Sequence, residues 1–312
     1  MRRFTFLAGV QLTIIVLAGC GRGTSEKPVD ALPETAKPAI QPPDSEQSEA
    51  DLPTSKPTTP TSPLEQLNAA LKAKNPEFAG QIALQPMGPN TLAAELRDPA
   101  ITDISPLSGL PIAALDLAGC HVTDIGPLRG MPLVVLYLED TGVKDISVLK
   151  GMSLRELRLN NTQVEDISPL RGAPLEQLNL YGTRVSDLDP LAGSPVQMLW
   201  LNKCPVSDIG PLKTVPLVSL TLAETKVSDL GPLKGHPLKR LHIAHSEVTD
   251  LSVLQWMRLT RLIFTPAKIK SGIEHARNMQ SITEIDVKFG TGRYKPTSPA
   301  EFWPLYDAGR FN

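Results

Sequence analysis

A 21-residue unit repeats along most of the chain and limits the folds that the chain can adopt. Between Leu154 and Pro174 the unit reads LRELRLNNTQVEDISPLRGAP, and the same pattern returns when the sequence is shifted by 21 residues in either direction. A degenerate copy between Leu96 and Leu107 keeps the same register. A repeat of this length indicates units that stack on one another. The first position of the regular units falls on Ile112, Leu133, Leu154, Leu175, Val196, Leu217, Leu238 and Leu259, with no insertion between them.

The pattern inside the unit predicts a strand followed by a tight turn. Positions 1, 4, 6, 11, 14 and 17 are apolar in nearly every copy. Leu-x-Leu at positions 4–6 is typical of a strand, because alternate side chains share a face. Asp-Ile-x-Pro-Leu at positions 13–17 cannot form a long helix, since Pro lies within it and Gly follows. One unit is too short to form a core alone, so we expect stacked units with parallel strands.

This strand-turn repeat, with its length and leucine spacing, resembles the leucine-rich repeat family over about residues 91–287. The resemblance implies an α/β solenoid with a parallel β-sheet on the concave face and short turns or 3₁₀ segments on the convex face. It also implies that position 9 holds an inward, small or polar residue that satisfies backbone groups after the strand. That column contains Cys120, Thr141, Thr162, Thr183, Cys204, Thr225 and Ser246.

Position 13 is Asp in every copy from Asp103 to Asp250. An Asp just before a tight helical turn caps the free N–H groups of that turn. A stack of carboxylates also raises the alternative of calcium binding. The Gly-rich nonapeptide of calcium-binding β-rolls is absent, so we expect capping.

Residues 1–19 have the features of a bacterial export signal, with Arg2 and Arg3 before an apolar stretch that is short for a membrane span. The sequence Leu17-Ala18-Gly19-Cys20 resembles the lipobox of bacterial lipoproteins. The resemblance implies cleavage before Cys20, a diacylglycerol thioether on its sulfur and an acylated, palmitate-type amino terminus. We therefore expect a lipid-anchored protein of the cell envelope, and Gly21 favours the outer membrane over the inner one. The alternatives are an uncleaved signal anchor and plain secretion with a chance Cys.

Residues 20–63 contain the predicted lipidated Cys and then a segment rich in Pro, Ser and Thr that lacks aromatic residues. Such a composition cannot bury enough apolar surface to order the chain, so we predict a disordered tether. Residues 64–90 follow as an expected amino-terminal cap. Ser62 and Glu65 form a capping box, and Leu64, Leu67, Ala70 and Leu71 are predicted to share one helical face. A first hairpin is expected from Gln81–Leu84 and Thr91–Leu96.

The regular array ends near Ile269, with a helix expected over Ser271–Gln280 and a last strand around Ile285. Residues 288–312 form the predicted carboxy-terminal cap, where Ser298 and Glu301 make a second capping box. The tail EFWPLYDAG resembles that of repeat proteins from planctomycete-type bacteria, in which similar arrays occur in lipoproteins and beside kinase domains. No kinase domain is present in this chain.

Cysteine and histidine spacing gives no sign of a metal site. Cys120 and Cys204 lie four units apart in one column, which is about 19 Å at the usual strand spacing and too far for a disulfide. We predict two free, buried thiols. His242 and His245 lack a further ligand, and no catalytic or cofactor-binding motif appears. The net charge of −2 and the lack of any run of Lys or Arg indicate neither a basic patch nor nucleic-acid binding.

We expect side chains at positions 3, 5 and 7 to point to solvent from the concave sheet face. The chain is only 4% aromatic, yet Tyr137, Tyr181 and Trp200 fall on this face. Trp, Tyr and Arg are enriched at binding hot spots, although aromatic residues on a sheet also support strand pairing alone. The predicted partner-binding residues are Tyr137, Arg158, Asn179, Tyr181, Met198, Trp200, Asn202, Arg240 and His242.

Three functions agree with this pattern, and none of them is enzymatic or needs a cofactor. The first is a membrane-anchored recognition protein that binds a protein partner through the concave sheet face. The second is a module that binds carbohydrate, such as an envelope glycan, because Tyr and Trp beside Asn and Arg suit sugars too. The third is a structural envelope spacer without a specific ligand.

Overall fold

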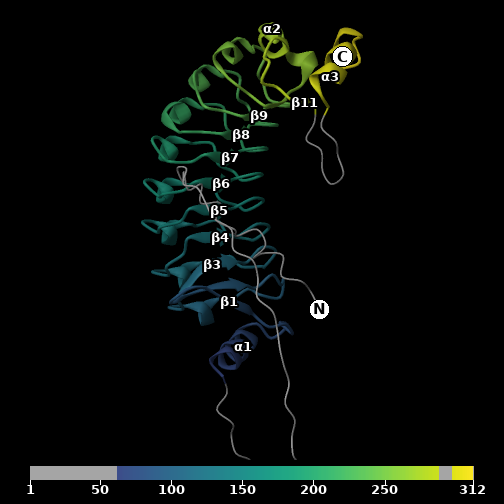
Figure 1. Ribbon diagram of the computed structural model, residues 1–312. Coiled ribbons are helices and arrows are strands. Elements are labelled where there is room, and N and C mark those ends of the chain that lie inside the picture. Colours follow the sequence, from purple (N-terminus) through teal and green to yellow (C-terminus); the bar gives the residue numbers. More distant parts are fainter. Residues whose placement is uncertain (1–61, 288–296, 312) are drawn as a thin grey trace, which may run out of the picture. The chain divides into compact units, whose positions relative to one another are not determined.

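The computed structural model describes residues 62–287 and 297–311 of the chain. Within these residues, eleven strands form one sheet whose spatial order follows the sequence (Figure 1). The strands are β1 (Ala83–Gly88), β2 (Thr91–Glu95), β3 (Ile112–Asp116), β4 (Val135–Tyr137), β5 (Glu156–Arg158), β6 (Gln177–Asn179), β7 (Met198–Trp200), β8 (Ser219–Thr221), β9 (Arg240–His242), β10 (Arg261–Ile263) and β11 (Glu284–Asp286).

The register of the sheet is that of the repeat. From β3 to β10, each residue pairs with the residue 21 positions later, so that Leu136, Leu157 and Leu178 are consecutive partners. Strands β2 to β11 pair in parallel, whereas β1 is antiparallel to β2. The strands follow an arc with the sheet on its inner side and the short helical turns on its outer side (Figure 1). The predicted solenoid is therefore confirmed, as is the first hairpin, with β1 beginning two residues later than expected.

Each unit returns to the sheet through a short 3₁₀ turn. In all eight copies from Asp103 to Asp250, the position-13 carboxylate Oδ1 accepts the backbone N–H two residues later at 2.7–2.8 Å, which confirms the capping role. Most units end this turn with a left-handed Gly at position 19, whereas Thr214 and Trp256 replace that Gly and their turns are longer. The turns are η1 (Ser105–Leu107), η2 (Gly126–Leu128), η3 (Ser147–Leu149), η4 (Ser168–Leu170), η5 (Asp189–Leu191), η6 (Gly210–Thr214), η7 (Gly231–Leu233), η8 (Ser252–Trp256) and η9 (Pro266–Lys268).

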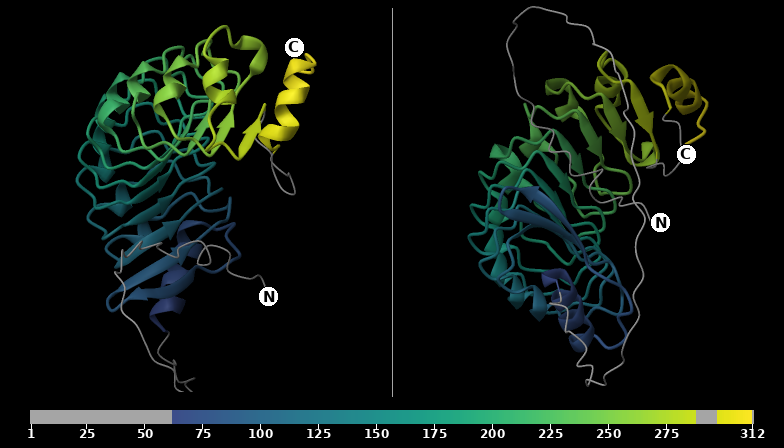
Figure 2. Two further views of the ribbon diagram at one scale, coloured as in Figure 1. Left: turned by 45° about the horizontal axis from the view of Figure 1, so that its top comes forward. Right: turned by 60° about the horizontal axis from the view of Figure 1, so that its bottom comes forward.

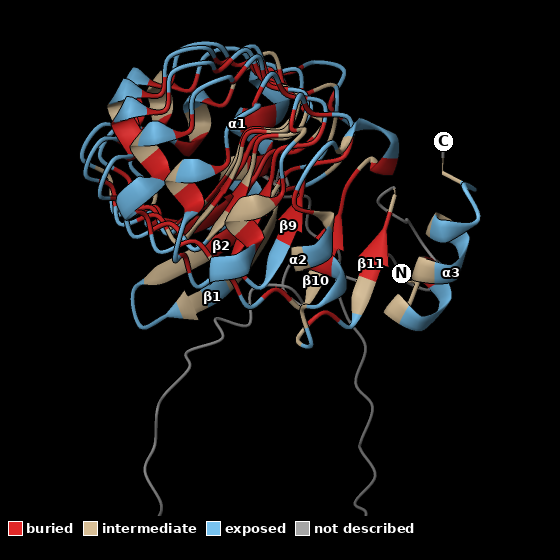
Figure 3. Cartoon of the chain, turned by 90° about the horizontal axis from the view of Figure 1, so that it is seen from above, coloured by how far each residue is buried: buried red, intermediate tan, exposed pale blue. Residues whose placement is uncertain are grey.

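One apolar core runs the length of the stack, between the sheet and the 3₁₀ turns (Figure 3). Position 9 is buried throughout, and its Thr and Ser hydroxyls donate to the carbonyl of position 6 in the same unit; for example, Thr162 Oγ1 donates to Leu159 O at 2.6 Å. Cys120 and Cys204 instead donate to carbonyls of the preceding unit. The side chains at position 9 therefore donate hydrogen bonds to backbone carbonyls after the strand, as predicted.

Helix α1 (Pro63–Lys74) covers the amino-terminal end of the stack (Figure 1), and its Ser62–Glu65 capping box is confirmed. The predicted apolar face is wrong in part, because Leu64 and Ala70 are exposed while Asn68 and Leu71 are buried. The Asn68 side chain donates to Leu64 O and accepts from the Ile82 backbone N–H. These bonds fix the rotation of the helix, so that a polar residue takes an inward position.

The carboxy-terminal end carries α2 (Ile273–Arg277), shorter than the helix expected over Ser271–Gln280, and α3 (Pro299–Asp307). The Ser298–Glu301 capping box of α3 is confirmed. Helix α3 lies beyond β11 in Figures 1 and 2. Phe302 is buried and packs against Phe264 of the last units, with ring centroids 5.8 Å apart. This contact joins α3 to the solenoid core.

The predicted signal peptide, the lipobox Cys20 and the tether lie outside the described residues. None of the helices in residues 62–287 and 297–311 combines the length and the hydropathy that a membrane crossing requires.

Candidate functional site

Side chains on the concave sheet face are unequally exposed. In β5, β6 and β7 the two outward residues of each strand are partly exposed on either side of a buried Leu. All residues of β3, β4 and β8 are buried. The accessible part of the face is therefore centred on β5–β7.

The expectation that positions 3 and 5 point to solvent is wrong for several strands. These residues lie on the sheet face, but neighbouring side chains cover them. Parallel strands are only about 4.8 Å apart, so a large side chain on one strand covers a small one on the next. The buried residues at positions 3 and 5 are Ala114, Asp116, Val135, Tyr137, Ser219, Thr221, His242 and Ile263, and those at position 7 are Ala118, Ala223 and Ala244.

Tyr137 and Arg158 form the polar network next to this accessible centre. The guanidinium carbon of Arg158 lies 4.0 Å from the centroid of the Tyr137 ring, which is a cation–π contact. Tyr137 donates its hydroxyl proton to Glu156 Oε1 at 2.7 Å, and Arg158 binds the same carboxylate through Nε and Nη2. Arg158 also approaches Glu139 at 3.4 Å. The network holds Arg158 rigidly and leaves part of its guanidinium exposed.

Carboxylates gather on the amino-terminal side of that network. Glu95 and Asp116 are register partners on β2 and β3, and Arg97 Nε lies 3.7 Å from Asp116 Oδ2. Burial raises the pKa of Glu95, Asp116 and Glu139 above the ordinary value, and Asp116 raises the pKa of the other two further. These carboxylates were not identified as a site from the sequence. Aligning the units at their 21-residue spacing would have placed them on adjacent strands.

The centre of the face combines aromatic rings with amides. Asn179 and Trp200 are register partners on β6 and β7, and Met198 lies beside them on β7. Tyr181 is partly exposed, with Lys203 Nζ 5.4 Å from its ring centroid. Within the described residues, the buried Oδ1 of Asn202 accepts no hydrogen bond. A ligand here would meet two partly exposed rings, a thioether and hydrogen-bonding amides.

The two remaining predicted residues lie on β9, separated from the centre by the small side chains of β8. Arg240 is exposed, whereas His242 is buried. Burial, together with the positive charge of Arg261 and the nearby His245, lowers the pKa of His242 to about 4. The imidazole is therefore neutral at pH 7 and is not a surface cation. The structure places Tyr137, Arg158, Asn179, Met198 and Trp200 on the four neighbouring strands β4–β7, with Tyr181 and Asn202 just after β6 and β7. Arg240 and His242 lie apart from them on β9.

The buried Cys120 and Cys204 are free thiols, as predicted. Burial raises the pKa of Cys120 to about 11 and also raises that of Cys204. Both thiols therefore stay protonated at neutral pH, which makes them weak nucleophiles.

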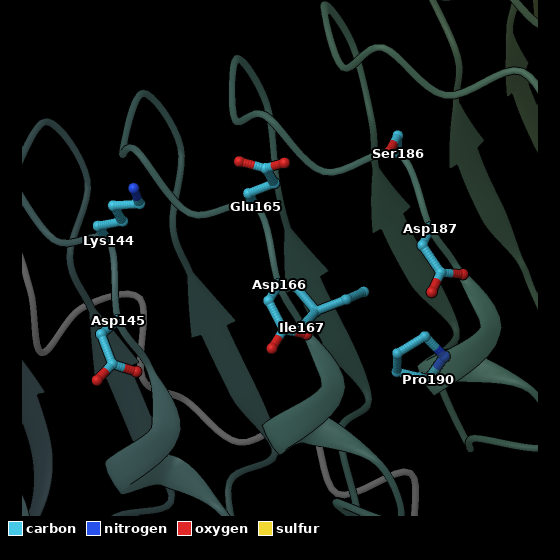
Figure 4. A pocket seen from close by; sticks show the side chains of 8 residues that line it. All are labelled: Lys144, Asp145, Glu165, Asp166, Ile167, Ser186, Asp187 and Pro190. Atoms are coloured by element: carbon cyan, nitrogen blue, oxygen red, sulfur yellow. The ribbon is translucent and has the colours of Figure 1, made fainter.

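A groove of about 560 Å³ crosses three turns on the outer side of the stack, away from the sheet face (Figure 4). Asp145, Asp166 and Asp187 line it, but each already accepts a backbone N–H of its own turn. Among the described residues, no group of His, Cys, Asp or Glu is arranged to hold a metal ion. We attribute this groove to the spacing of the repeated turns.

No known protein-family model matches the sequence. No curated protein matches it either. Solved structures are similar to it. The crystal structure of an internalin, InlF, from Listeria monocytogenes has a TM-score of 0.53 and 26% identity, over 72% of this chain and 72% of that chain. Internalin C2 of the same organism has a TM-score of 0.46 and 21% identity, over 72% of this chain and 93% of that chain.

The similarity to InlF agrees with the parallel strands, the 3₁₀ turns and the 21-residue register described above. The fold is therefore that of a leucine-rich repeat solenoid.

Proposed function

We propose that the protein is a non-enzymatic recognition protein that binds a protein partner through the centre of its concave sheet face. The observation that supports this most directly is the group of Tyr181, Met198 and Trp200, which lie on or next to β6 and β7 and stay partly exposed. Aromatic rings of this kind dominate the binding energy of protein interfaces. Arg158 extends the group towards β5 with a guanidinium that Glu156 already holds in place.

Pre-organisation favours binding at this surface. The strands are paired on both sides, so the rings and amides sit on a rigid support and little conformational entropy is lost when a partner docks. The acidic residues beside Arg158 add a negative field at one end of the surface, which favours partners with cationic groups there.

We also propose that the protein acts from the bacterial cell envelope, attached to a membrane by lipid on Cys20, at the outer membrane or on the periplasmic side. This proposal rests on the lipobox-like tetrapeptide Leu17-Ala18-Gly19-Cys20. Several acyl chains anchor a protein stably, where one chain binds only reversibly. Cells fed labelled palmitate should label the parent protein but not a Cys20→Ala variant, and label on both would contradict the anchor.

The sheet-face proposal is tested with full-length protein that carries Tyr181→Ala and Trp200→Ala together. A matched control removes two exposed apolar side chains elsewhere, by Leu64→Ala and Leu305→Ala. All proteins are first shown to melt alike and are then cross-linked in solubilised envelope from the source cells. We expect a protein partner with the parent and the control and none with the sheet-face variant.

Other outcomes would replace the proposal. Equal capture by parent and sheet-face variant would move the site off the sheet centre. Binding that is lost in the variant but survives protease digestion of the envelope sample would favour a glycan ligand, which stacks on the same Tyr and Trp rings. No capture and no effect of any substitution would favour a structural spacer.

A further inference from the structure

One edge of the solenoid, where the strands begin, collects basic residues. Positions 18–21 and position 2 of each unit form this edge, and we call its cations the basic edge. Among these positions of the regular units, the acidic residue is Glu176, which Arg155 holds at 2.8 Å. No run of Lys or Arg occurs in the sequence, but the register of the sheet places cations that are 21 residues apart on adjacent turns. The basic edge consists of Arg129, Lys150, Arg155, Arg171, Lys213, Lys234, Lys239 and Arg258.

Within the part of the chain that the structure describes, Arg155 is the one cation of the basic edge that forms an ion pair. The position-18 cations are all exposed, and within the described residues none of them forms an ion pair. The Asp column at position 13 lies on the outer side of the stack, where Asp229 and Asp250 line the same groove as Lys234 and Trp256. A row of exposed cations without ion pairs attracts an anionic surface.

Trp256 lies on the same edge and is 54% exposed. It occupies position 19, where five of the other regular units have a left-handed Gly. Lys234 Nζ lies 4.5 Å from the centroid of its ring, beside a groove of about 250 Å³. Trp prefers the boundary between lipid and water, because its ring is apolar and its N–H is polar. An exposed Trp among cations therefore favours a phospholipid surface over a soluble polyanion, which would use the charges alone.

We propose that the basic edge and Trp256 bind the surface of an anionic phospholipid bilayer. The Lys and Arg side chains contact headgroup phosphates, and the Trp256 ring enters the headgroup layer. This site is separate from the sheet face and independent of the proposed anchor on Cys20. Bound in this way, the solenoid lies with one edge on the membrane while the residues of the sheet face, such as Tyr181 and Trp200, stay accessible to a partner.

The test measures binding of full-length protein to phosphatidylcholine vesicles with and without phosphatidylglycerol. One variant combines Arg129→Ser, Lys150→Ser and Arg171→Ser. Its control combines Lys144→Ser, Arg184→Ser and Lys226→Ser, three exposed cations off the edge with the same change in net charge. Each cation near an anionic surface contributes about fivefold in affinity, so the edge variant should lose about 100-fold on vesicles with phosphatidylglycerol. The control should stay close to the parent.

Two further variants distinguish the loss of this membrane-binding site from a loss of binding caused by misfolding. Ala192 is an exposed, uncharged residue in the position-18 column, and Ala192→Lys should tighten binding about fivefold. Trp256→Ser should weaken vesicle binding with little loss of stability, because this side chain is 54% exposed. In a Trp200→Phe/Trp303→Phe background, Trp256 is the remaining tryptophan of the chain, and its fluorescence should shift to shorter wavelength on vesicles.

Several results would overturn the proposal. Equal losses in the edge variant and the off-edge control would mean that only net charge matters. No preference of the parent for phosphatidylglycerol would remove the electrostatic basis. Edge-dependent binding of inorganic polyphosphate, without edge-dependent binding of vesicles, would assign the edge to a soluble polyanion instead.

Discussion

At the scale of single residues, His242 shows how a side chain on the sheet face becomes part of the packing. Its neighbours on the adjacent strands are Thr221 and Ile263, and all three are buried. Burial makes the protonated imidazole unfavourable, and the nearby Arg261 adds repulsion. His242 is predicted from the sequence to bind a partner at the surface, whereas in the structure it is buried and neutral.

We predict that His242 makes the protein less stable in mild acid. The unfolded imidazole titrates near pH 6.5 and the folded one near 4, so the unfolded state binds more protons between these values. The free energy of unfolding therefore falls as the pH drops from about 6.5 towards 4, by about 2 kcal/mol at pH 5. Urea unfolding of the parent and a His242→Gln variant at pH 7 and pH 5 measures this difference.

The comparison between those two proteins isolates the imidazole. Glu95, Asp116 and Glu139 have raised pKa values, which act in the opposite direction: their destabilising effect is lost as the pH falls. They are present in both proteins and cancel in the difference. An equal loss of stability in parent and variant would show that His242 already accepts a proton at pH 5 without cost.

At the scale of the element, the short 3₁₀ turns depend on their Asp caps. Asp166 Oδ1 accepts the Ser168 backbone N–H at 2.7 Å, and its Oδ2 accepts the Ser168 hydroxyl proton at 2.9 Å. A turn of three residues has few internal hydrogen bonds, so an outside acceptor for its first N–H stabilises it appreciably. Five residues of each unit, from the Asp to the inward Leu, thus form one local structure.

We predict that Asp166→Ala lowers the free energy of unfolding by about 1 kcal/mol, because the N–H of Ser168 loses its acceptor. Asp166→Asn keeps a carbonyl oxygen in place and should lose clearly less. The neighbouring exposed Glu165→Ala is the control and should change little. Denaturant unfolding measures all three, and equal losses for the Asn and Ala variants would mean that the negative charge, and not the hydrogen bond, stabilises the turn.

At the scale of the whole molecule, the solenoid is a one-dimensional stack in which each unit contacts its neighbours. Such stacks open from their ends, where the core would otherwise meet water. The end of the stack beyond β11 is covered by α3, whose Phe302 is stacked on Phe311 with ring centroids 4.8 Å apart and packs against Phe264. Stability of the last units should therefore depend on this helix.

We predict that Phe302→Ala costs about 3–5 kcal/mol in the last units, since it removes a buried aromatic side chain. Hydrogen exchange should show faster exchange of the β10 and β11 amides, with the β5–β7 amides unchanged. The control Leu305→Ala lies on the same helix but is exposed, and it should leave exchange as in the parent. Faster exchange spread evenly over all strands would mean that the solenoid unfolds as one unit.

The candidate site could be predicted from the sequence only in part. The columns at positions 3, 5 and 7 correctly indicated which residues lie on the sheet face, since the register is that of the repeat. They did not show that Tyr137 is covered by Arg158, because this contact depends on the sizes of side chains on adjacent strands. For the same reason, the partly exposed centre on β5–β7 emerged only when the strands were stacked.

The sequence by itself determined the period, the parallel register, the strand and turn positions, and the roles of the position-9 and position-13 residues. These features arise within one unit and recur in every unit, so each copy of the repeat supports the same interpretation. Only the tertiary structure decided which sheet-face residues are buried, how Asn68 sets the rotation of α1, and that isolated cations form the basic edge. The physical reason is that these properties arise between residues 21 or more positions apart, which only the stacking of units about 4.8 Å apart brings into contact.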